Sequence, residues 1–115
     1  MKKFILSLLM VAGVAVAAGP FTRGAGKILA ATTTPQQLTL ASHVGELSVY
    51  NATGDVLWCL VNTSTAVLTT EVAAGTAVPI PALVTYTFNA QGQGSIRTLE
   101  YRTATGSGDV YVGGF

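Results

Sequence analysis

The chain has 115 residues, enough for one domain, and only 10% of them are charged, against about 25% in an average soluble protein. The net charge of +1 hides an uneven distribution, since residues 1–35 hold four cations and no acid, whereas residues 36–115 hold five acids and two arginines. The acidic part lacks the basic surface that phosphate binding needs, which argues against a nucleic-acid-binding domain. The single cysteine, Cys59, excludes an intrachain disulfide.

Residues 1–21 are an apolar leader. Two lysines precede an apolar run from Phe4 to Ala18, and residues 15–17 (Ala-Val-Ala) supply the small-x-small pattern at which signal peptides are cut. The run is at the short limit for a membrane span, which needs about 17–25 residues. Two interpretations stay open: a cleaved signal peptide, or a retained anchor or arm in which Phe4 to Phe21 contacts a membrane.

Residues 22–36 combine glycine, small residues and two cations, and are predicted to form a linker or arm. From residue 37 to residue 115, short β-prone runs alternate with turns rich in Gly and Asn, which tolerate positive φ. No helix is predicted there. Seven strands are predicted, at Gln37–Ala41, Glu46–Asn51, Val56–Val61, Ala66–Glu71, Leu83–Phe88, Ile96–Arg102 and Asp109–Gly113.

The arrangement of these strands can be narrowed further. The uninterrupted apolar run Val56–Val61 predicts a central strand covered on both faces. Pro79 and Pro81 each remove a backbone donor, so their segment should be an edge strand or a loop that crosses between sheets. The sequence therefore predicts an all-β fold, an antiparallel β-sandwich of jelly-roll-like or Ig-like type, preceded by an apolar N-terminal helix or arm.

Residues capable of chemistry are few. His43 and Cys59 would form an activated nucleophile if the fold brought them together. However, Cys59 lies in an apolar run, which is typical of a core residue, and His43 lies beside Gly45 in a predicted turn. One His and one Cys also fall short of the three or four protein ligands of a metal site. We predict no catalytic, cofactor-binding or metal-binding residues, no cofactor and no enzymatic activity.

Four other patterns have a functional and a structural interpretation. The stretch "RGAGK" at 23–27 resembles a phosphate loop but has Phe21 and Ile28 where that motif needs Gly and Ser or Thr. Tyr50 and Trp58 could stack on a sugar, although the apolar neighbours of Trp58 favour core packing. Asn51 and Asn62 each begin a glycosylation sequon. Glu100 and Arg102 are predicted to form a surface ion pair.

Three stretches within residues 47–115 follow one another: "LSVYNATGDVLWCLVN", "GTAVPIPALVTYTF" and "SIRTLEYRTATGSGDVYVGGF". In order and texture they resemble small β-sandwich proteins of bacteriophage particles, of the decoration, cement or spike-base type. The resemblance depends on five positions with a structural role, namely Asn51, Gly54, Gly75, Pro79 and Phe88. The resemblance implies a virion structural role without catalytic residues. The apolar leader departs from the pattern.

These observations give a leading hypothesis and two alternatives. The leading one is a non-enzymatic bacteriophage virion protein, a minor capsid, decoration or spike-base subunit, located in the virion. It would pack against capsid or other virion proteins and form homo-oligomers. The first alternative is an exported bacterial adhesion module with a cleaved signal peptide, located in the periplasm or at the cell surface. The second is a sugar-binding module that uses Tyr50 and Trp58.

Overall fold

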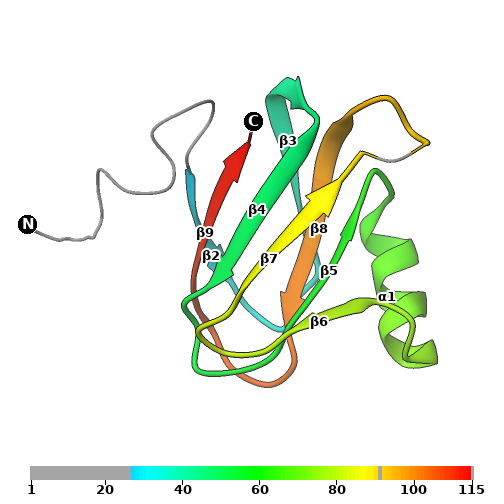
Figure 1. Ribbon diagram of the computed structural model, residues 1–115. Helices are drawn as coiled ribbons and strands as arrows, with labels where there is room; N and C mark the ends of the chain where they lie inside the picture. Colours follow the sequence, from blue (N-terminus) through cyan, green and yellow to red (C-terminus); the bar gives the residue numbers. More distant parts are fainter. Residues whose placement is uncertain (1–26, 91, 115) are drawn as a thin grey trace, which may run out of the picture.

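The computed structural model describes residues 27–90 and 92–114, which form two antiparallel four-stranded sheets and one helix (Figure 1). The predicted leader, including Phe4–Phe21, lies outside the described residues. Within the described residues 27–90 and 92–114, no helix is long and apolar enough to cross a membrane. The elements are β2 (Lys27–Ala31), β3 (Gln36–Val44), β4 (Glu46–Asn51), β5 (Leu57–Val61), α1 (Thr65–Ala74), β6 (Val78–Ile80), β7 (Thr85–Asn89), β8 (Ile96–Thr103) and β9 (Gly108–Gly114).

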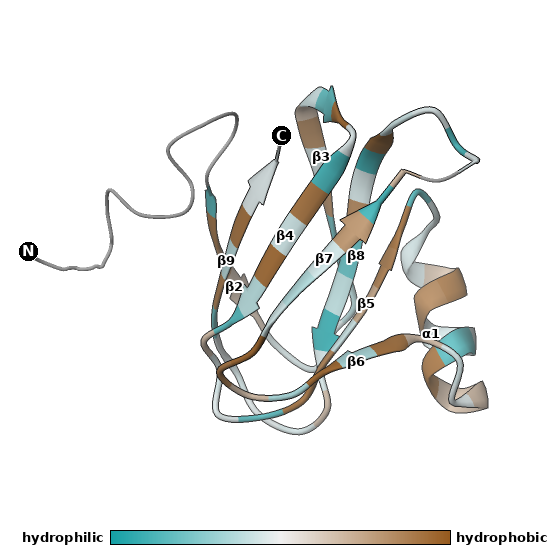
Figure 2. Ribbon diagram, viewed as in Figure 1, coloured by the Kyte–Doolittle hydropathy of each residue, from teal (hydrophilic) through white to brown (hydrophobic). Residues whose placement is uncertain are grey.

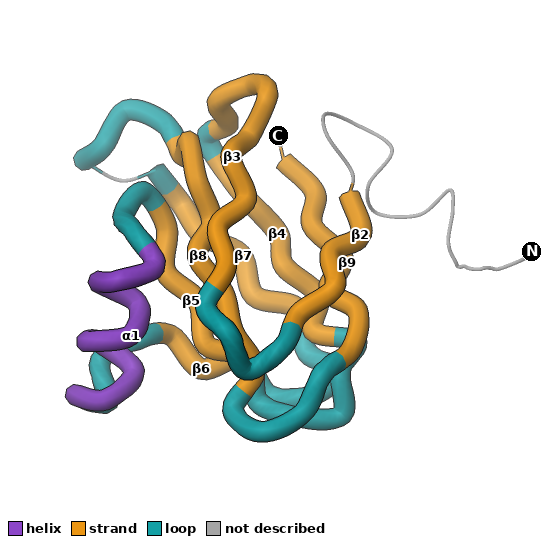
Figure 3. The backbone as a smooth tube through the Cα atoms, turned by 180° about the vertical axis from the view of Figure 1, so that it is seen from behind, coloured by secondary structure: helices purple, strands orange, loops and turns teal. Residues whose placement is uncertain are grey.

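The strand order is that of a jelly roll. One sheet has the order β2-β9-β4-β7 and the other the order β3-β8-β5-β6. Four antiparallel pairs are nested in the sequence: β5 with β6, β4 with β7, β3 with β8, and β2 with β9. Rolling this long hairpin adds the pairs β4 with β9 and β5 with β8, and yields two facing layers (Figure 3). The predicted antiparallel sandwich is confirmed, and the nested order selects the jelly roll among the two expected types.

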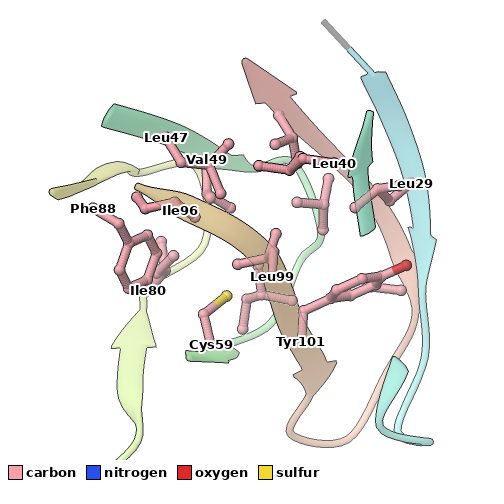
Figure 4. Close-up of a cluster of buried hydrophobic side chains, with 14 of the residues drawn as sticks. Leu29, Leu40, Leu47, Val49, Cys59, Ile80, Phe88, Ile96, Leu99 and Tyr101 are labelled. Atoms are coloured by element: carbon pink, nitrogen blue, oxygen red, sulfur yellow. The ribbon is translucent and has the colours of Figure 1, made fainter. Parts of the chain in front are cut away.

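The core lies between the sheets and is built by alternation along each strand. In β4, Leu47 and Val49 are fully buried, whereas Ser48 and Tyr50 face outward and are half-buried. Figure 2 shows this alternation as bands along β4, and Figure 4 shows the inward side chains from both sheets meeting in one cluster. Each fully buried Leu or Ile contributes roughly 2 kcal/mol to the free energy of unfolding.

The strand predictions differ in how well their boundaries hold. Strand β4 has the predicted bounds, and β5, β7, β8 and β9 begin and end within two residues of theirs. Strand β3 runs to Val44 rather than Ala41, because its pairing with β8 shifts register between Thr39 and Val44. The intervening residues 41–43 are exposed. An irregularity of this kind interrupts the period-two pattern on which the prediction rests.

The predicted strand Ala66–Glu71 is wrong, because these residues lie in α1. The β-branched residues of this segment favoured a strand, but the local signals for a helix are stronger. The Ser64 side chain accepts a hydrogen bond from Val67 N at 3.2 Å, and Gly75 ends the helix in the left-handed conformation at φ 76°. Leu68 is fully buried and anchors the helix, which lies next to β5 (Figure 1).

The sandwich begins before residue 37, the predicted start of the domain. Residues 27–31, expected within a linker, form β2 and pair with β9 over their whole length. Leu29 and Ala31 are buried in the core, while Lys27, Ile28 and Ala30 are exposed. The alternation covers only five residues and follows a glycine-rich stretch, so the sequence pattern alone did not separate it from a linker.

The proline segment lies at a sheet edge, as predicted. Strand β6 contains Pro79 and, among the described strands, pairs only with β5; the chain then crosses to β7 in the other sheet. Strand β5 lies between β8 and β6, which confirms its central position, but its outward-facing Trp58 and Leu60 are only half-buried, so its outer face is covered less than predicted. Among the described strands, β2 and β7 are therefore the edges of the first sheet, and β3 and β6 are the edges of the second.

Candidate functional site

His43 and Cys59 are not brought together. Cys59 is fully buried in the core, and burial raises the pKa of its thiol, so it stays protonated. His43 is exposed on β3 next to Val44, which pairs with Ile96, whereas Cys59 pairs with Tyr101. Those two β8 positions lie roughly 16 Å apart along the strand. The pair therefore cannot act as nucleophile and base.

The aromatic residues of the sugar-binding alternative face opposite sides of the sandwich. Tyr50 is on the outer face of its sheet, with its ring centroid 5.9 Å from that of Tyr111. Trp58 lies between the inward-facing Leu57 and Cys59 and so faces outward from the other sheet, where it is half-buried. The expected core packing of Trp58 is wrong for this reason. Tyr50 and Trp58 cannot form one stacking platform.

Three sequence patterns remain: the stretch 23–27, a metal site and the sequon that begins at Asn62. Of the stretch 23–27, only Lys27 is within the described residues, where it begins β2. Within residues 27–90 and 92–114, no three His, Cys, Asp or Glu side chains are grouped as a metal site would need. Asn62 donates to Gln93 Oε1 at 2.7 Å and to the Ser95 carbonyl at 2.9 Å, which ties the end of β5 to the loop before β8.

Glu100 is a residue whose environment the sequence did not indicate. It was expected in a surface ion pair with Arg102, but its side chain is fully buried. Its Oε2 accepts a hydrogen bond from Gln37 Nε2 at 2.8 Å, and its Oε1 accepts one from Thr63 N at 3.2 Å. The Arg102 guanidinium instead donates to the carbonyls of Thr103 and Ala104. Glu100 thus joins β3, β8 and the segment that leads into α1.

The densest polar cluster surrounds Asn51, at the end of β4. The fully buried Asn51 side chain donates through Nδ2 to the carbonyl oxygens of Asp55, at 2.7 Å, and Ile80, at 2.8 Å. Its Oδ1 accepts from Thr53 N at 3.0 Å and from the Thr53 hydroxyl at 2.6 Å. We call Asn51, Thr53 and Asp55 the polar corner. Since Ile80 belongs to β6, the corner links the two sheets directly.

Asp55 extends the polar corner to the turn between β8 and β9. Its Oδ2 accepts from Thr105 N at 2.6 Å, from the Thr105 hydroxyl at 2.7 Å and from Gly106 N at 2.9 Å. Its Oδ1 accepts from Val56 N at 2.8 Å. These hydrogen bonds, the Thr105 hydroxyl first, lower the pKa of Asp55 from 3.8 to about 2. At neutral pH the carboxylate is therefore ionised and holds the turn.

The exposed apolar surface is concentrated beside this corner. Leu83 is 67% exposed, and Val84 and Tyr86 are each 41% exposed. We call these three residues the rim. Leu83 has φ 63°, in the left-handed region, and its N donates to the Asn51 carbonyl at 2.7 Å while Asn51 N donates to the Val84 carbonyl at 3.0 Å. Two rim residues thus face one β4 residue, which is a β-bulge whose first position usually holds Gly.

Leu83 therefore has a backbone conformation that favours glycine, although it is a leucine. A non-Gly residue in the left-handed region costs about 1–2 kcal/mol. The chain places a large, exposed, apolar side chain on this strained backbone. Sequence reasoning missed it because it placed Leu83 inside a regular strand. Backbone strain of this kind is concentrated at functional positions, and the rim is the candidate functional site.

The comparisons with known proteins give no family. The sequence matches no protein-family model, and comparison with curated proteins and with solved structures finds no match.

The lowered pKa of Asp55 predicts that the stability difference between the wild type and a variant without this carboxylate depends on pH. Because the folded pKa is near 2 and the ordinary value is 3.8, its stabilisation is present above about pH 4 and is lost as the pH falls toward 2. The variant Asp55→Asn should unfold at lower denaturant concentration than the wild type at pH 7, and this gap should narrow between pH 4 and pH 2. Urea unfolding followed by tryptophan fluorescence measures it.

The matched control is Asp109→Asn, which removes the same charge from an exposed position in β9. It should leave the unfolding midpoint at pH 7 close to that of the wild type. A gap for Asp55→Asn that is as large at pH 2.5 as at pH 7 would contradict the assigned role of the carboxylate.

Proposed function

We propose that the protein is a non-enzymatic structural protein of a bacteriophage virion, a minor capsid, decoration or spike-base subunit. The observation that carries the proposal is the jelly-roll strand order, β2-β9-β4-β7 facing β3-β8-β5-β6. This architecture is frequent in viral capsid domains, and it also occurs in lectins and cupins. A function inferred from the fold alone is an argument by analogy. The surface of the protein therefore has to support the same function.

The surface supports packing against other proteins. Only 10% of the residues are charged, and the cores of protein interfaces are depleted in charge. Of the large apolar residues that are exposed, the rim contributes three within four positions of the sequence. Aliphatic and aromatic side chains that are exposed within four positions at an edge strand suit a contact with a protein neighbour.

The strained conformation of Leu83 supports the same conclusion. Gly at this position would relieve the strain, and a polar residue would relieve the exposure of apolar surface. Leu does neither, so its side chain is useful only if a neighbour covers it. In the proposed function, Leu83 is buried by an adjacent virion subunit.

The N-terminal sequence favours a second candidate, an exported periplasmic or surface adhesion module. Residues 1–18 have the charge, apolar run and cleavage pattern of a signal peptide. The two candidates differ in where the protein is found and in its N-terminal residue. The virion protein would retain the leader as an anchor or arm, whereas the exported module would begin at Ala18.

Density-gradient sedimentation of the native material, followed by immunoblotting and N-terminal sequencing, tests the proposal. We expect the protein to co-sediment with a particle far heavier than a small oligomer and to retain residues before Ala18. Recovery only in the light fractions, with Ala18 at the N-terminus, would overturn the virion proposal in favour of the exported module.

The rim yields a prediction about incorporation into particles. In Leu83→Gly, relief of the backbone strain is offset by the greater chain entropy of the unfolded state, so the free energy of unfolding should change by less than about 1 kcal/mol. The amount of protein per particle should nevertheless fall severalfold, because the contact side chain is gone. Immunoblots of gradient-purified particles measure this.

The control for this variant is Ile28→Thr. Ile28 is 65% exposed on β2, the opposite edge strand of the same sheet, so the substitution removes apolar surface away from the rim. It should be incorporated at the wild-type level. Wild-type incorporation of Leu83→Gly would contradict the role of the rim.

A further inference from the structure

We propose that the open edge of β7 pairs with β7 of a second copy of this chain. The two strands would run antiparallel about a two-fold axis and join two four-stranded sheets into one continuous sheet. The proposal rests on the structural role proposed above, because it names the first neighbour that such a subunit would contact.

After its bulge at Leu83 and Val84, strand β7 is the edge that has the least protection against pairing. Edge strands are usually blunted by proline, by irregular geometry or by lysine. Strand β6 contains Pro79, β3 shifts register between Thr39 and Val44, and β2 begins with Lys27. Strand β7 reads TYTFN, without proline or charge, and four of its five residues are exposed. In the described part of the chain, β7 pairs only with β4.

The backbone of β7 has groups available for a new strand. Asn51 N donates to the Val84 carbonyl at one end of the β4–β7 pair, and Ala90 N donates to the Gly45 carbonyl at the other. Hydrogen-bonded pairs in an antiparallel ladder recur at every second residue. Between Val84 and Ala90, the residues whose N–H and C=O groups face the open edge are therefore Thr85, Thr87 and Asn89.

A two-fold axis through Thr87 would use all three of these residues. Thr87 would face its own copy, and Thr85 would face Asn89 of the second copy. Tyr86 would then lie opposite Phe88 of the second copy. The same two side chains already contact each other within one chain, with ring centroids 4.7 Å apart. Aromatic pairs across strands stabilise a sheet, and Tyr86, now 41% exposed, would be covered.

Charge also favours a second copy as the partner. About a two-fold axis, each charge approaches the same charge on the partner, and like charges that face each other destabilise paired strands. Residues 83–90 read LVTYTFNA and contain no charged residue. Self-pairing at this edge therefore brings no like charges together.

Sedimentation velocity of the purified full-length chain over a range of concentrations tests the pairing. The wild type should form a dimer. Thr87→Lys places two lysines opposite each other at the axis and should weaken the dimer about fivefold. Thr87→Pro removes a backbone donor from each strand at the open edge, while the pairing with β4 is kept, and should weaken the dimer about tenfold.

The matched control is Ser48→Lys. Ser48 lies opposite Thr87 on β4, and their hydroxyl oxygens are 3.1 Å apart, so this variant loses the same side-chain hydrogen bond and gains the same charge away from the edge. It should dimerise like the wild type. A monomeric wild type, or equal dimerisation of wild type and both Thr87 variants, would overturn the proposal.

The outcome is separable from that of the proposed function. A protein that is monomeric in solution but co-sediments with particles would overturn the pairing alone. A protein that dimerises through β7 but is recovered only in light fractions would overturn the virion role alone.

Discussion

The hydrogen bonds of the buried Asn51 side chain are the interaction on which the rest of the structure depends. A jelly roll sends most of its connections from one sheet to the other, and three of them, β4–β5, β6–β7 and β8–β9, meet at the polar corner. Asn51 donates to the carbonyls of Asp55, in the connection between β4 and β5, and of Ile80, at the end of β6, and Asp55 continues the network into the turn before β9. A buried carbonyl without a donor costs about 1–3 kcal/mol, so each of these connections needs such a partner.

The same residue connects the stability of the fold to its surface. Through its backbone, Asn51 accepts from Leu83 N and donates to the Val84 carbonyl, which holds the bulge that presents the rim. Immediately after the bulge, β7 runs as an uncharged edge strand with open backbone groups. The interior of the corner thus positions an exposed surface that suits protein contacts. This arrangement is consistent with a subunit that functions by packing against its neighbours.

Those parts of the fold that depend on simple periodicity could be predicted from the sequence. The alternation in β4 follows from burial of one face, and the edge position of β6 follows from the backbone donor that Pro79 lacks. The segment 66–71 was mistaken for a strand because β-branched residues are frequent in strands, and Val67, Thr69 and Thr70 make up half of it. Its helix is selected by the caps at Ser64 and Gly75 and by the burial of Leu68.

The candidate site was less accessible to prediction than the fold. The left-handed conformation of Leu83 accompanies the two backbone hydrogen bonds of Asn51, one from Leu83 N and one to the Val84 carbonyl, and Leu83 and Asn51 are 32 positions apart. A single sequence contains no local signal for it, because the usual signal would be a glycine. Glu100 is a similar case, since its burial depends on Gln37 and Thr63 from distant segments.

Hydrogen–deuterium exchange of the protein, compared between the free monomer and the assembled particle, tests the central claim most directly. The amides of Thr53, Leu83 and Thr105, which donate into the polar corner, should be protected in both states. The amides of Thr85 and Thr87 should exchange rapidly in the monomer and become protected in the particle. Equal exchange of these two amides in both states, or rapid exchange at the polar corner, would contradict the account.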